Sequence, residues 1–183
     1  MIEFKMCKTA VAAAAVFAAA GAFAANGNKA DYSAAKERIE AEYKADKKAC
    51  DASKGNQNDI CKAQAKGKNE VALAEAEFNY TGKAADANKL AVTKADTAYG
   101  VAKEMCDDKG SQAKDLCMSE AKAAHTKALA DAKLTKKVDS AAADATEDKR
   151  DADYKVATQK CDSLGGDAKA ACINAAKVKF KKS

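Results

Sequence analysis

Six of the seven cysteines in this chain form three regular pairs, and no other feature constrains its fold as strongly. Ten residues separate the members of each pair, which are Cys50 and Cys61, Cys106 and Cys117, and Cys161 and Cys172. The first members lie 56 and then 55 residues apart, so the chain is one unit repeated three times. Six cysteines allow fifteen connectivities. The repeat favours the three local bridges, each of which would staple one unit to itself.

The first 24 residues have the three parts of a secretory signal peptide. Lys5 and Lys8 form a basic start, residues 9–20 are an alanine-rich apolar run, and Ala22 and Ala24 occupy the small-residue positions of a cleavage site. The run is too short to span a bilayer, and no later stretch is apolar enough. We therefore expect residues 1–24 to be removed with Cys7, and the mature chain to be exported to a bacterial periplasm. That compartment oxidises thiols, so the remaining cysteines are expected to form disulfide bonds.

The composition predicts an all-α protein with a weak core. About a quarter of the residues are alanine, there is no proline, and aromatic residues make up 5%. Alanine, lysine and glutamate favour helices, but a methyl group buries little apolar area. A disulfide across a loop of this size adds roughly 2–3 kcal/mol by restricting the unfolded chain. The three bridges are therefore expected to decide whether the chain folds.

A tyrosine precedes the first cysteine of each pair by seven residues, at Tyr43, Tyr99 and Tyr154. Tyrosine and cysteine belong to one stripe with helical spacing, which is typical of coiled-coil packing. In the second unit the stripe is Val92, Ala95, Tyr99, Ala102 and Cys106, and in the first it is Ile39, Tyr43 and Cys50, with Asp46 as a polar exception. We predict that each tyrosine is the largest core residue of its unit. The alternative is that the tyrosines bind a partner helix.

A glycine lies beside a capping residue between the cysteines of each pair. The three dipeptides are Gly55-Asn56, Gly110-Ser111 and Gly166-Asp167. Glycine suits the left-handed residue that ends a helix, and Asn, Ser or Asp suits the N-cap of the next helix. The sequence therefore predicts three antiparallel helical hairpins in series, over residues 29–82, 83–138 and 139–182, each stapled by its local disulfide.

The segments between the hairpin tips can be continuous helices or can break midway. Residues 79–82 end in Gly82 and are a plausible break in the first segment. Residues 135–140 contain neither glycine nor proline, so a continuous helix is favoured in the second.

The sequence offers little for catalysis or nucleic-acid binding. His125 is the only histidine and has no partner nearby in the sequence, and its alanine- and lysine-rich surroundings predict a solvent-facing side chain. The chain has no Cys-x-x-Cys motif, no zinc spacing and no glycine-rich phosphate loop. We expect no enzymatic activity, no catalytic residue and no cofactor. The net charge is +5, but the charges alternate in sign, which is typical of solvated helix faces and not of a nucleic-acid arm.

One cluster of soft ligands suggests a different function. Met105 precedes Cys106, and Met118 follows Cys117. If the second pair were reduced, two thiolates and two thioethers near one tip would suit Cu(I). The other two units have no methionine in these places. The alternative prediction is therefore a thiol-based copper or redox responder centred on the second tip.

The repeated motif Y-x-x-x-x-x-x-C-D followed by C-x-x-x-A-K, within an alanine- and lysine-rich exported chain, resembles a group of uncharacterised bacterial periplasmic repeat proteins. Such proteins are often labelled TolA-like cell-envelope proteins, and the resemblance spans roughly residues 31–180. It implies a helical protein of the cell envelope, without implying any functional residue. We therefore expect a non-catalytic structural or interaction protein, such as an adaptor or stress-protective factor, whose partner is another envelope protein. The sequence does not predict its oligomeric state.

Overall fold

The computed structural model describes residues 28–182, and these residues form five α-helices joined by short turns. The helices are α1 (Lys29–Cys50), α2 (Asn56–Thr81), α3 (Ala84–Asp107), α4 (Ser111–Cys161) and α5 (Gly166–Phe180). The prediction of an all-α protein is confirmed for this part of the chain. The predicted signal peptide and Cys7 lie outside the described residues.

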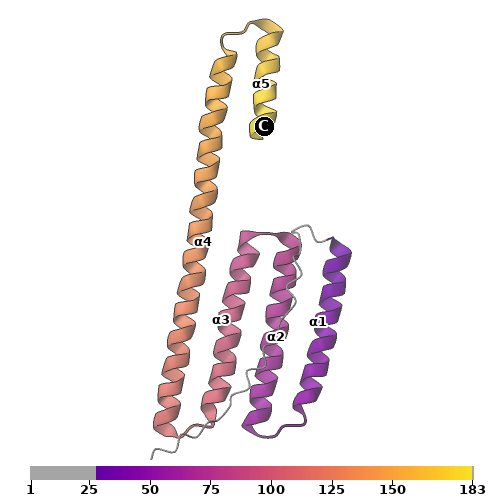
Figure 1. The fold of residues 1–183 in the computed structure, drawn as a ribbon, viewed down its shortest axis with the longest axis vertical. Helices are drawn as coiled ribbons and strands as arrows, with labels where there is room; N and C mark the ends of the chain where they lie inside the picture. Colours follow the sequence, from indigo (N-terminus) through magenta and orange to yellow (C-terminus); the bar gives the residue numbers. More distant parts are fainter. Residues whose placement is uncertain (1–27, 183) are drawn as a thin grey trace, which may run out of the picture.

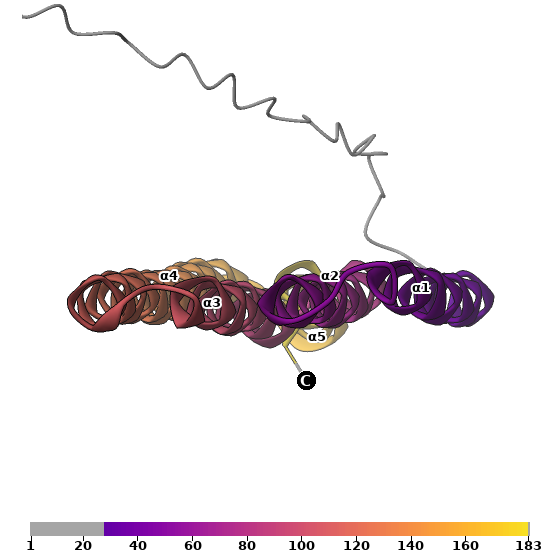
Figure 2. The same cartoon turned by 90° about the horizontal axis from the view of Figure 1, so that it is seen from below.

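Helices α1 to α4 form a single layer, and α5 packs against α4 (Figures 1 and 2). Each helix packs only against its neighbours in the sequence, so that α1 contacts α2, α2 contacts α3, α3 contacts α4, and α4 contacts α5. Figure 2 shows α1 to α4 from their ends as one row. With 51 residues, α4 extends well beyond the other helices and carries α5 beside its far half (Figure 1). Within residues 28–182, no helix covers either face of the layer.

The boundary between α2 and α3 is set by one glycine. Gly82 has a φ of 62°, in the left-handed region, and its N–H donates to the carbonyl of Phe78 at 2.8 Å. This geometry ends a helix and suits glycine, which has no Cβ to clash. The predicted break at residues 79–82 is confirmed. The continuous helix favoured over residues 135–140 is also confirmed, because this segment lies inside α4.

The predicted N-caps at the three disulfide-bearing turns are wrong. Asn56, Ser111 and Asp167 lie inside the helices, and the N-caps are Gly55, Gly110 and Gly165, none of which makes a side-chain capping hydrogen bond. The helices before these turns end at right-handed residues, so glycine does not end them either. In the first turn the side chain of Asn58 binds carbonyl groups at the end of α1 and in the turn. It donates to the carbonyls of Cys50 and Ser53 at 2.6 and 3.2 Å.

The three local disulfides are present as predicted. They join Cys50 to Cys61, Cys106 to Cys117, and Cys161 to Cys172, with Cα–Cα distances of 5.5, 5.7 and 5.8 Å. These distances fall within the range that a disulfide requires. In every pair the first cysteine is 1% exposed, and these three are the largest fully buried side chains of the described residues. The sulfur bridges therefore form the best-buried part of the interior.

The remainder of the interior consists mostly of methyl groups. Apart from the three cysteines, the buried apolar residues of the described chain are Ile39, Ala65, Ala74, Ala95, Ala132 and Ala176. The predicted stripe is partly buried, since Ile39 and Ala95 belong to this set while Val92 and Ala102 are half-buried. Burial of so few small side chains removes little apolar surface from water. Covalent bridges at the turns are therefore the main compensation.

Two local contacts explain how the neighbouring helices approach each other. Gly67 of α2 packs against Thr97 of α3, and a Cβ added at Gly67 would lie 3.1 Å from the Thr97 Cβ. Asp46, the polar exception in the stripe of α1, pairs with Lys68 of α2 at 2.8 Å. This hydrogen-bonded partner raises the pKa of Lys68. Because the ion pair is exposed, it adds little to the free energy of unfolding and mainly helps to align α1 with α2.

Candidate functional site

A groove of about 680 Å³ crosses one face of α1, α2 and α3. Tyr43 and Lys47 of α1 line one side, and Gly100 of α3 lies on the opposite side. The floor is formed by α2, where Gly67 contributes no side chain. The groove is therefore a feature of the layer as a whole, because three consecutive helices must lie side by side to form it.

The depth of the groove depends on Gly100. A Cβ added there would meet no atom within 4 Å, so the glycine is not required by close packing. Its helical conformation is one that any residue can adopt. A glycine inside a helix costs about 1 kcal/mol relative to alanine. At this position it leaves space above α3 that a side chain would fill.

The groove carries charges of both signs. Its basic residues are Lys47, Lys62 and Lys66, and its acidic residues are Asp59, Glu70, Asp96 and Glu104. Lys66 and Glu70 are 3.8 Å apart across one turn of α2. The Lys47 ammonium lies 5.4 Å from the centre of the Tyr43 ring, a cation–π distance. Such a surface complements a segment that itself alternates in charge, and does not select a single anion or cation.

A second groove, of about 480 Å³, lies between α2 and α3 on the other face. Its lining includes Val71, Ala98 and Met105 and is mainly apolar. Ala98 and Gly100 are two residues apart on α3, which places them on opposite sides of the helix. The two grooves therefore open on opposite faces of the layer.

The three repeated tyrosines are half-buried, so the prediction that they are core residues is met only in part. Tyr43 lines the first groove. Tyr99 stacks on His125 of α4, with ring centroids 4.7 Å apart and planes at 11°. Tyr154 meets the edge of Phe180 of α5 at 6.2 Å. Each tyrosine therefore contacts a different kind of neighbour.

The prediction that His125 is solvent-facing is wrong. Its side chain is 19% exposed, and its Nε2 lies 2.6 Å from a carboxylate oxygen of Asp96. Stacking on Tyr99 covers one face of the ring. The partners come from α3, about 29 residues earlier in the chain, and local sequence therefore could not reveal them.

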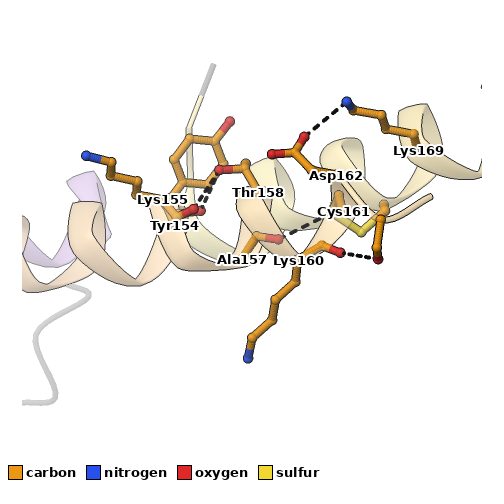
Figure 3. The surroundings of a disulfide bond; sticks show 10 residues. Tyr154, Lys155, Ala157, Thr158, Lys160, Cys161, Asp162 and Lys169 are labelled. Atoms are coloured by element: carbon orange, nitrogen blue, oxygen red, sulfur yellow. Dashed lines mark hydrogen bonds and ion pairs between the residues drawn. A yellow bond between two sulfur atoms is a disulfide. The ribbon is translucent and has the colours of Figure 1, made fainter. Parts of the chain in front are cut away.

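The aspartate that follows the first cysteine of the second and third pairs has a role that sequence reasoning missed. Asp107 pairs with Lys114 at 2.8 Å, and Asp162 pairs with Lys169 at 3.0 Å. Figure 3 shows the second of these pairs closing the turn beside the third disulfide. The hydrogen bond to Asp107 also raises the pKa of Lys114. Both lysines stand three residues before the second cysteine, and this recurrence was the available signal.

In the first unit the residue three positions before the second cysteine is Asn58 and not a lysine, and it donates to backbone carbonyls. The neighbouring Asn56 links two turns, because its Nδ2 donates to the carbonyl of Glu104 in α3 at 3.0 Å. The first and second disulfide-bearing turns therefore lie side by side at one end of the layer (Figure 1). The third lies at the far end of α4.

The structure has the two cysteines of the proposed copper site in an oxidised form. Cys106 and Cys117 are bonded to each other. Met105 is 54% exposed, and Met118 is half-buried. A bridged pair offers no thiolate, so the alternative prediction of a copper responder requires prior reduction. Among residues 28–182, no group of three or more His, Cys, Asp or Glu side chains is arranged to hold a metal ion.

Comparisons with known proteins identify no relative. No family model, no curated protein and no solved structure matches this chain. Of the helices in the described part of the chain, none combines the length and apolar character needed to cross a membrane.

Proposed function

We propose that this chain is a non-catalytic structural or interaction protein of the cell envelope, acting in the periplasm as an adaptor or stress-protective factor. The three disulfides support an oxidising compartment, where such bonds persist. The repeat of cysteine, tyrosine and turn residues supports a chain of stapled helical hairpins. The structural support for an interaction role is the exposed single layer, which presents side chains of three helices together on one face.

The mixed-charge groove across α1, α2 and α3 carries this proposal. Its charged side chains are exposed or half-buried and come from three different helices. A partner segment with alternating charges could pair with Lys62 or Lys66 on one side and with Glu104 on the other. Tyr43 supplies an aromatic surface in the same groove, and aromatic residues are enriched where proteins bind each other. We therefore assign the groove to a polypeptide segment of an envelope protein.

In-cell crosslinking tests this assignment. A photo-crosslinking amino acid replaces Gly100, where an added side chain meets no neighbouring atom and projects into the groove. The matched control places the same amino acid at Ala98, on the opposite side of α3. We expect a defined adduct with an envelope protein from position 100 and none from position 98. Equal adducts from both positions, or none from position 100 while the protein is present in the envelope, would contradict the proposal.

A further inference from the structure

The outer edge of α4 carries an apolar stripe that no part of the described chain covers. The stripe is Leu116, Ala123, Ala130, Leu134, Val138, Ala141, Ala145, Ala152 and Val156, all of which are exposed. Four of these are large side chains, and their exposed fractions range from 50% to 62%. Successive members are three, four or seven residues apart, which keeps them on one side of the helix, where Lys127 interrupts the stripe between Ala123 and Ala130. We propose that this edge binds the same edge of a second copy, with the two α4 helices antiparallel.

Within the part of the chain that the structure describes, the position of α4 leaves this edge uncovered along its whole length. Both α3 and α5 lie on the same side of α4, and the other side faces solvent (Figure 1). The residues that face α3 and α5, such as His125, Ala132 and Tyr154, fall on the opposite side of the helix from the stripe. A second layer can therefore approach without meeting α1, α2, α3 or α5.

The middle of α4 has a second property that an intramolecular contact does not explain. Every residue from 133 to 149 is exposed, because this stretch lies beyond the ends of α3 and α5. A single helical stretch of this length is marginal in water. On the side facing the space between α3 and α5 the stretch is polar, with Lys136, Asp139 and Glu147. Its large apolar side chains, Leu134 and Val138, face the outer edge instead.

The apolar stripe is complementary to itself in the antiparallel direction. When the twofold axis lies between residues 139 and 140, Leu134 of one copy lies opposite Ala145 of the other. In the same alignment Val138 lies opposite Ala141. These two central layers, and the outer layer of Ala123 with Val156, then pair a large side chain with a small one, which is how close-packed interfaces fill space. The same alanine-based packing joins the helices within the chain, for example through Ala95 and Ala132.

The charges beside the stripe favour the same alignment. Lys133, Lys137, Asp144 and Asp148 lie on one flank, within about 60° of each other around the helix. In an antiparallel pair this flank faces its own copy, so Lys137 meets Asp144, and Lys133 meets Asp148. A parallel pair would place this flank of the two copies on opposite sides of the interface, so these lysines and aspartates would not meet. None of the four is used in an ion pair within residues 28–182, where the nearby pairs involve Glu147, Arg150 and Asp151.

Charge reversal tests the interface with the purified protein that lacks its predicted signal peptide, residues 1–24. Sedimentation equilibrium should show a dimer for the wild type. Lys137→Asp and Asp144→Lys should each raise the dissociation constant by roughly tenfold or more, since each reversal makes two symmetry-related contacts repulsive. An equimolar mixture of the two variants should recover wild-type affinity, because the heterodimer restores opposite charges. The matched control is Lys136→Asp, on the other side of the helix, which should dimerise as the wild type does.

Two results would overturn the proposal. One is a wild type that stays monomeric up to the limit of its solubility, which would leave the edge to a different protein. The other is a dimer that neither reversal weakens, which would place the interface elsewhere. Val138→Asp gives an independent check, because it should abolish the dimer while circular dichroism still shows a folded, mainly helical protein. The measurement uses no envelope partner, so its outcome is independent of the crosslinking test of the groove.

Discussion

The third disulfide should hold α5 in place almost alone, and its removal provides a direct test. In the variant Cys161→Ala/Cys172→Ala we expect α5 to separate from α4 and lose its helix, while α1 to α4 remain folded. The reason is the small interface between the two helices. Ala176 is the only buried residue of α5, and the main aromatic contact is that between Tyr154 and Phe180.

The expected magnitude follows from the closed loop. The bridged residues are separated by 11 positions in the sequence. For a loop of this size the chain-entropy relation gives about 2.8 kcal/mol of stabilisation. Its loss shifts the docking equilibrium of α5 by about 100-fold. The aromatic contact supplies roughly 0.5–1.5 kcal/mol, and a 15-residue helix is marginal by itself. The remaining contacts are therefore too weak to keep α5 docked.

Hydrogen exchange measured by mass spectrometry distinguishes local from global loss. Residues 166–180 should exchange at the rate of an unfolded chain, and α2 and α3 should keep their protection. The matched control is Cys50→Ala/Cys61→Ala, which opens a loop of the same length. There α1 should stay docked, because Ile39 is buried and Tyr32 stacks on Tyr80 at 4.7 Å at its other end.

Full protection of residues 166–180 in the third-disulfide variant would refute this reasoning. It would mean that contacts between methyl groups suffice to dock a short helix. If α1 in the first-disulfide variant lost as much protection as α5 in the third-disulfide variant, the stacking of Tyr32 on Tyr80 would contribute nothing to docking of α1, which also contradicts the reasoning.

Two further predictions concern contacts within the layer. Gly100→Ala should stabilise the protein by up to about 1 kcal/mol, because alanine has the higher helix propensity and the added Cβ meets no neighbouring atom. Gly67→Ala should lose this gain or destabilise the protein, because its Cβ would lie 3.1 Å from that of Thr97. Denaturant titration measures the unfolding free energy of both variants, and equal changes would contradict the packing argument. Tyr99→Ala and His125→Ala should show a coupling of roughly 0.5–1.5 kcal/mol in a double-mutant cycle, and simple additivity would show that the stacked rings do not interact.

The sequence predicted the features that repeat and missed those that depend on one packing partner. The disulfide connectivity follows from three equal spacings, so local reasoning was sufficient. The break at Gly82 was also local, because a left-handed residue favours glycine wherever it occurs. The environment of His125 was not predictable in this way, since its partners Asp96 and Tyr99 lie on another helix.

The capping predictions failed for a different physical reason. The dipeptides with glycine were correctly placed at the turns, but the roles of the two residues were shifted by one position. Gly55 and Gly110 occupy the N-caps, where a side-chain oxygen was expected. The turns are closed by other groups, including the pair of Asp107 with Lys114. This pair joins the two sides of the turn beside the second disulfide, which fixes the distance between the helices.

The uninterrupted length of α4 also sets the geometry of whatever the two ends of the protein contact. From Cys117 to Cys161 the helix rises about 66 Å, so it fixes the distance between the second and third disulfides. The same helix fixes their angular phase, because inserting one residue would swing α5 by about 100° around the axis. Inserting seven would nearly restore its bearing and displace it by about 10 Å. Length changes in this spacer are thus coupled to rotation, and only some of them preserve the direction in which α5 points.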